Sequence, residues 1–92
     1  MAQVAVTLKI LPENPNIKLE EIGEATRKIL NKYGKIASIR IEPIAYGINA
    51  IVFVFIMDES KGGTEGIENE IKKVKGISDV RIDDVTRLTE EI

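Results

Sequence analysis

The sequence contains neither cysteine nor histidine. Without cysteine, the chain can form no disulfide, no thiolate nucleophile and no zinc finger. Without histidine, it lacks the commonest general base and the commonest metal ligand. We therefore expect a protein that is not an enzyme and that holds neither a cofactor nor a metal.

Aromatic residues are scarce, at 4% of the chain, and the longest apolar run is too short to span a membrane as a helix. The first residues lack the basic region and apolar block of a signal peptide. The net charge of -2 leaves no basic surplus that would favour nucleic acid or an anionic membrane as the main partner. The expected location is cytoplasmic, with no direct nucleic-acid or membrane partner.

The composition is that of a globular protein, with 43% hydrophobic and 30% charged residues among 92. A chain of this length can form one hydrophobic core, but it is too short to form a deep active-site cleft in addition. We expect residues 1–92 to form a single domain.

Residues 48–57 are apolar at every position except Asn49 and are rich in β-branched and aromatic types. This pattern predicts a strand buried on both faces. Further strands are predicted over residues 3–11, 35–42 and 77–88. In the 35–42 strand, alternation predicts that Ala37, Ile39 and Ile41 share one face.

Two amphipathic helices are predicted between these strands. One begins near Leu19 and ends at Gly34, and the other begins near Thr64 and ends at Gly76. The order β-α-β-β-α-β predicts an α+β fold, the ferredoxin-like split β-α-β sandwich. Its four-stranded antiparallel sheet would carry both helices on one face, with the 48–57 strand central. The tail from Thr89 to Ile92 is expected to fray.

The turn before the 48–57 strand contains the most informative side chain. Pro43 is expected to end the preceding strand, because proline offers no N–H to a ladder. Gly47 provides the conformational freedom of a tight reversal and puts Tyr46 at the corner. The Tyr46 ring would either cap the core or contact another molecule.

Three weaker features each have two interpretations. The sheet face without helices would be an apolar interface or a tolerated apolar surface, unless a bulge changes the strand's parity. The segment from Gly62 through Gly63 to Thr64 would bind an anion or, more simply, connect to and cap a helix. The carboxylates of Asp79, Asp83 and Asp84 would bind a hard cation or protect an edge strand.

Several segments together resemble one family. They are VAVTLKILPE at residues 4–13, EPIAYG at 42–47, GGTE at 62–65, SDV at 78–80 and DVTRL at 84–88. In this order and spacing, the chain is similar to archaeal translation elongation factor 1-beta over essentially its whole length. The resemblance implies a guanine nucleotide exchange factor for elongation factor 1-alpha, the GTPase that delivers aminoacyl-tRNA to the ribosome.

The resemblance also implies the residues that contact the GTPase. Eukaryotic relatives carry phenylalanine in a Pro-Ile-x-Phe-Gly segment, which Tyr46 matches. They also use a lysine next to their last residue against the Mg²⁺ site, to which Arg87 corresponds if a gap is allowed. The expected partner-binding residues are therefore Pro43, Ile44, Ala45, Tyr46, Gly47 and Arg87.

Two other functions are compatible with the pattern. Small-molecule-binding regulatory modules, including amino-acid sensors, share the β-α-β-β-α-β order. Hydrolysis by a carboxylate pair is a more remote alternative, because no spacing in the sequence selects such a pair.

Overall fold

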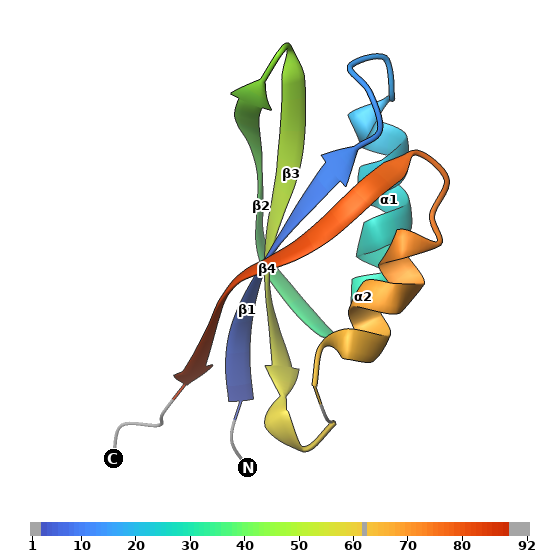
Figure 1. The fold of residues 1–92 in the computed structure, drawn as a ribbon. Helices are drawn as coiled ribbons and strands as arrows, with labels where there is room; N and C mark the ends of the chain where they lie inside the picture. The colour runs from blue at the N-terminus through green and yellow to red at the C-terminus, as the bar shows by residue number, and fades with distance from the viewer. Residues whose placement is uncertain (1–2, 62, 89–92) are drawn as a thin grey trace.

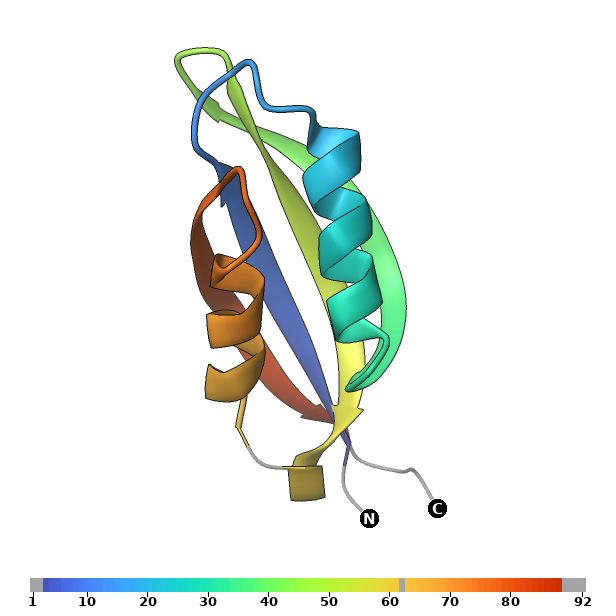
Figure 2. The ribbon, with the colours of Figure 1, turned by 90° about the vertical axis from the view of Figure 1, so that its right-hand side faces the viewer.

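The computed structural model describes residues 3–61 and 63–88, with the side chain of Lys61 left out. It contains one antiparallel sheet with both helices on the same face (Figures 1 and 2). The elements in chain order are β1 (Gln3–Pro12), α1 (Leu19–Leu30), β2 (Gly34–Ala45), β3 (Ile48–Asp58), the short 3-10 helix η1 (Glu59–Lys61), α2 (Glu65–Lys72) and β4 (Ile77–Leu88). The predicted fold class is confirmed. Residues 89–92, the predicted frayed tail, lie outside the described residues. Among the described residues, no helix has the length and apolar character needed to cross a bilayer.

The strands are arranged in the spatial order β2-β3-β1-β4, so β3 is central as its composition predicted. Its register pairs Phe53 with Leu8 of β1 on one side and with Ile39 of β2 on the other. β2 and β4 are the two edge strands.

The core lies between the sheet and the helices. β3 contributes alternate side chains to it, among them the fully buried Phe53 and Phe55. The helices contribute Ile22 and Leu30 from α1 and Ile71 from α2. The remaining members of this cluster are Val6, Leu8, Ile10, Ile51, Met57, Ile67, Ile77 and Val80. Burial of these apolar groups is the main term that stabilises the fold.

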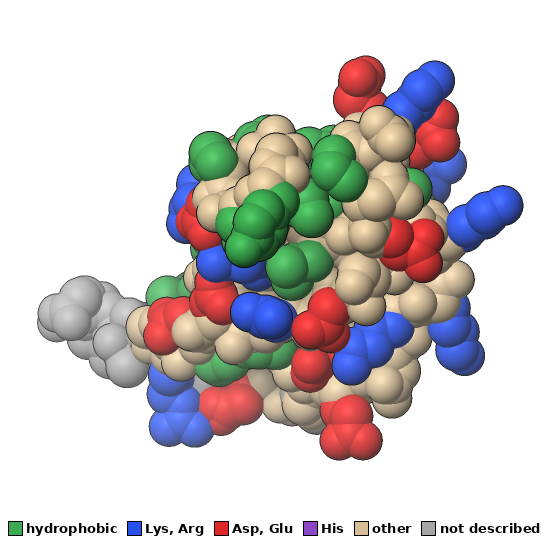
Figure 3. Space-filling view, turned by 45° about the horizontal axis from the view of Figure 1, so that its top comes forward, with side chains coloured by type: hydrophobic (Ala, Val, Ile, Leu, Met, Phe, Trp, Pro, Cys, Tyr) green, Lys and Arg blue, Asp and Glu red, His purple; other side chains and the backbone are tan. Residues whose placement is uncertain are grey.

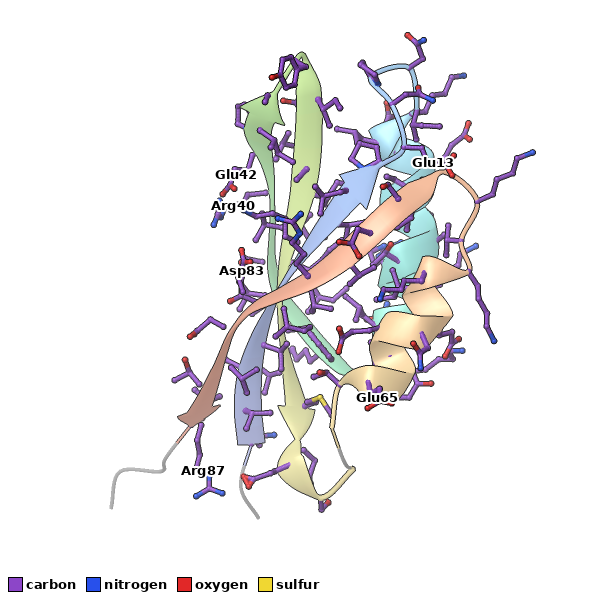
Figure 4. The ribbon with its side chains drawn as sticks, in the orientation of Figure 1. Glu13, Arg40, Glu42, Glu65, Asp83 and Arg87 are labelled. Atoms are coloured by element: carbon purple, nitrogen blue, oxygen red, sulfur yellow. The ribbon has the colours of Figure 1, made fainter. Side chains whose placement is uncertain are left out.

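The sheet face without helices buries the apolar side chains at its centre. Ala50 and Val52 of β3 lie on that face, yet they are 0% and 1% exposed. Beside them runs a chain of charged groups, in which Lys9 Nζ lies 2.6 Å from Glu42 Oε2 and 3.6 Å from Asp83 Oδ2. Figure 4 shows Glu42 and Asp83 on the side of the sheet away from the helices. Lys9 therefore links both edge strands across the centre of this face, and it holds the pKa of the Glu42 carboxyl below its ordinary value.

The structure corrects two predicted features of β2. The strand does not end before Pro43 but continues to Ala45, with a register shift between these residues. Proline is compatible with this position because β2 is an edge strand. A second register shift, between Ile36 and Ser38, removes Ala37 from the alternation, so Ile36 rather than Ala37 shares the inner face with Ile39.

Gly34 does not end α1, which stops at Leu30. It begins β2 and lies against the backbone of β3, where it pairs with Met57. A Cβ atom at Gly34 would overlap the carbonyl oxygen of Ile56. Glycine is thus needed here for the close approach of two strands, not for a helix end.

We expect Gly34→Ala to destabilise the protein by about 1–3 kcal/mol, because the added methyl has only backbone to displace. Gly66→Ala is the matched control: beyond the backbone of its own helix and its chain neighbours, no atom lies within 4 Å of a Cβ built there, and alanine favours the helix. Denaturant unfolding of both variants measures the difference. Equal free energies of unfolding for the two variants would show that the close approach at Gly34 does not limit the stability of the fold.

Candidate functional site

The connection between β2 and β3 is a hairpin whose loop consists of Tyr46 and Gly47 alone. Both residues have positive φ, 53° for Tyr46 and 75° for Gly47. Positive φ at both central residues is the requirement of a type I′ turn, whose twist matches that of the flanking strands. The five predicted contact residues from Pro43 to Gly47 therefore lie together at one end of the sheet (Figure 1).

The Tyr46 side chain is 95% exposed. The alternative that its ring caps the core is wrong, and the ring is free to contact another molecule. Exposure of so large an aromatic group opposes the hydrophobic effect and calls for an explanation beyond folding.

The backbone at Tyr46 supports the same conclusion. Glycine, asparagine and aspartate are the residues that normally occupy a position with this φ in a two-residue hairpin. A bulky side chain there costs of order 1–2 kcal/mol. A residue that is both exposed and strained contributes little to the stability of its own fold, which is typical of functional sites.

Exposed apolar side chains extend from the hairpin along β2. Beyond Tyr46, they are Ile44, Ile41 and Ile39. Figure 3, in which this end of the molecule is tilted toward the viewer, shows hydrophobic side chains gathered there among charged groups. The prediction that Ile39 and Ile41 share one face of β2 is confirmed by the register, and both are about half exposed.

Arg87 is not part of this cluster. It lies near the end of β4, where it pairs with Val4 at the start of β1, at the opposite end of the sheet from the hairpin (Figure 4). Its guanidinium donates to Glu59 of η1, with Nε 2.9 Å from Oε2 and Nη2 2.6 Å from Oε2. No sequence signal indicated Glu59 as its partner.

The remaining candidates have local partners. Thr64 precedes α2 and donates its hydroxyl to Glu68 at 3.0 Å, in agreement with the interpretation of a connecting segment. Its side chain makes no capping bond to the helix backbone. Gly62 lies outside the described residues. On β4, three carboxylates each face a neighbouring polar group: Asp79 faces Arg81, Asp83 faces Lys9 and Asp84 faces Thr86. These contacts fit the interpretation of a protected edge strand.

Residues 5–88 match the family model described as the EF-1 guanine nucleotide exchange domain. The chain belongs to this exchange-domain family. Archaeal proteins named elongation factor 1-beta are similar to it over nearly full length. The protein from Staphylothermus marinus is 46% identical over 97% of this chain and 100% of the relative, and that from Methanobrevibacter smithii is 36% identical over 96% and 99%.

Solved structures are similar to this chain in fold alone. The ACT domain from GTP pyrophosphokinase of Chlorobium tepidum superposes with a TM-score of 0.61 at 15% identity, covering 94% of this chain and 99% of that domain. This likeness confirms the ferredoxin-like arrangement of the exchange domain and says nothing of ligand or activity.

The ion pair between Arg87 and Glu59 yields a pH prediction. The Arg87 guanidinium holds the pKa of the Glu59 carboxyl below its ordinary value. The stability from this pair is present above the ordinary pKa of about 4.3 and is lost as the pH falls through the lowered value. We expect Arg87→Gln to raise the Glu59 pKa, measured by NMR titration of the carboxyl carbon.

Arg81→Gln is the control for this titration, because Arg81 lies on the same strand and faces Asp79 instead. It should leave the Glu59 titration unchanged. An unchanged Glu59 pKa in Arg87→Gln would mean that the pair does not persist in solution.

Proposed function

We propose that this chain is a guanine nucleotide exchange factor that promotes GDP release from elongation factor 1-alpha. It would bind this GTPase and disturb its phosphate and magnesium site, without any covalent step, in the cytoplasm. The match to the exchange-domain family supports the class of activity. The observation that carries the contact is the almost fully exposed, backbone-strained Tyr46.

The hairpin from Pro43 to Gly47 would be the part of the factor that enters the GTPase. Its tight two-residue turn presents the Tyr46 ring on a narrow tip that a partner can surround. An aromatic ring supplies a large contact area at low entropic cost, which is why tyrosine is common among residues that dominate interfaces.

The exchange itself would follow from linkage. If the exchange factor binds best to a form of the GTPase that holds GDP and Mg²⁺ poorly, then the exchange factor and the nucleotide lower each other's affinity by the same ratio. GDP leaves when the factor binds, and incoming nucleotide then expels the factor.

A role for Arg87 in the same contact carries an additional cost. Arg87 would have to exchange its hydrogen bonds with Glu59 for new ones, and its partner would have to reach the opposite end of the sheet. We therefore assign the principal contact to the hairpin, with Arg87 as a separate candidate.

The direct test is the release of fluorescent GDP from elongation factor 1-alpha in a stopped-flow instrument. We expect micromolar factor to accelerate release, and the acceleration to shrink when EDTA has already removed Mg²⁺. No acceleration in Mg²⁺ would contradict the proposed function. An undiminished acceleration in EDTA would contradict the magnesium part of the mechanism alone.

The role of Tyr46 is tested by Tyr46→Asn. Asparagine is favoured at this turn position, so the variant should gain up to about 1 kcal/mol of stability. It should nevertheless slow exchange strongly, because the aromatic contact is lost. Thermal melting and the GDP-release assay measure the two effects separately. Lower stability with unchanged exchange would assign Tyr46 a structural role instead.

A further inference from the structure

A groove lies between the first half of α1 and β2. It encloses about 280 Å³ and lies at the end of the sheet where α1 begins and the β2–β3 hairpin projects (Figures 1 and 2). Its apolar lining consists of Leu19 and Gly23 from α1, Ile39 and Ile41 from β2, and Ile51 and Phe53 from β3.

The groove exists because α1 packs over β3 and leaves β2 partly uncovered. Gly23 allows the helix to approach β3 closely, since a Cβ there would lie only 3.3 Å from Ile51 Cδ1. On the other wall, Ile39 and Ile41 remain 48% and 52% exposed. Two neighbouring inward-facing isoleucines are thus only about half covered by the described part of the chain.

The charges of the groove indicate what would cover it. Glu20, Glu24 and Arg27 of α1 line it together with the apolar residues. Arg27 Nη2 lies 2.7 Å from Glu24 Oε1, so these two charges compensate each other. Glu20 forms no ion pair with any residue that the structure describes. The uncompensated charge at the groove is therefore negative and complements a basic side chain.

The position of the groove favours a polypeptide. One wall is the edge strand β2, whose outer side has no neighbouring strand in the sheet. An extended segment can add to such an edge through its backbone while a side chain enters a pocket.

The groove and the hairpin share the strand β2. Ile41 lines the groove, and Ile44 and Tyr46 are exposed between it and the tip of the turn. A partner seated on the hairpin can therefore reach the groove along this strand.

We propose that the groove between α1 and β2 receives an extended segment of the GTPase that carries an apolar side chain next to a lysine or arginine. The apolar side chain packs between Leu19, Ile39 and Ile41, and the basic group pairs with Glu20. This inference rests on the proposed function and identifies a second contact beyond the hairpin, one that contributes affinity rather than the disturbance of the nucleotide site.

The first test compares Ile41→Thr with Val85→Thr. Val85 is a matched control, because it is 53% exposed on the other edge strand. Threonine keeps the β-branched shape that suits a strand, and it replaces one apolar branch of the side chain with a hydroxyl. In GDP-release assays at increasing factor concentration, Ile41→Thr should raise the half-maximal concentration by about fivefold or more, with the rate at saturation unchanged. Val85→Thr should change neither value.

The second test compares Glu20→Lys with Glu65→Lys. Both glutamates are exposed residues in the first turn of a helix, so both variants change net charge and helix dipole alike. Glu65 lies at the start of α2, away from the hairpin (Figure 4). Glu20→Lys should weaken binding, with the largest effect at low salt, whereas Glu65→Lys should bind like the unmodified factor.

The inference is overturned if each groove variant behaves like its control while the unmodified factor still accelerates release. It is also overturned if sedimentation shows a dimer that Ile41→Thr dissociates, because a second copy would then occupy the groove. Saturable binding of a free amino acid that Ile41→Thr abolishes would likewise overturn it. If the unmodified factor does not accelerate GDP release, the proposed function itself is contradicted. That outcome is thus distinguished from failure of the groove inference alone. Circular dichroism melts establish that each variant is folded.

Discussion

The structure depends on β3, a strand that is apolar on both faces. On the helix side, Phe53 and Phe55 form the centre of the core, and on the other side Ala50 and Val52 are equally inaccessible to water. Only a central place in the sheet, flanked by β1 and β2, buries both faces. The short hairpin keeps β2 next to β3. Because β1 occupies the other central place, β2 lies at the edge.

The edge position of β2 accounts for both proposed contact surfaces. The hairpin projects from the sheet because the paired strands β2 and β3 continue up to the two-residue turn. The groove forms because the first half of α1 leaves Ile39 and Ile41 of the outer strand partly uncovered. Along the opposite face of β2, Arg40 lies 3.0 Å from Glu42, and Glu42 also pairs with Lys9. One face of the edge strand thus carries charged side chains that form ion pairs, while the other face presents isoleucines. Only the charged face opposes indiscriminate pairing with other strands.

The two ends of the sheet also differ in the side chains that they present. The hairpin end presents unpaired apolar side chains and a strained aromatic residue. At the other end, Arg87 is held by Glu59, and the two helices are connected nearby through Glu70, which accepts hydrogen bonds from Lys32 and from the hydroxyl of Tyr33. The β4 strand also exposes Val85 and Leu88 toward that end, so what distinguishes the hairpin end is the strained, almost fully exposed aromatic residue.

Local patterns were sufficient to predict the order of the elements, the central position of β3 and the location of Tyr46 on a tight turn. They failed where two distant segments set the geometry. Gly34 looked like a helix end, but its small size serves the contact with Ile56 of β3. Ala37 alternated with Ile39 in the sequence, but a bulge against β3 replaced it with Ile36 on the inner face.

The sequence by itself determined the fold class and the family, because hydrophobic periodicity, turn residues and short segments such as EPIAYG are written along the chain. Only the tertiary structure decided that the Tyr46 ring faces solvent, that Arg87 lies at the far end paired with Glu59, and that Ile39 and Ile41 line an open groove. The physical reason is that exposure, ion pairing and groove shape depend on which remote residues the strand register and helix packing bring together, and no local pattern specifies those neighbours.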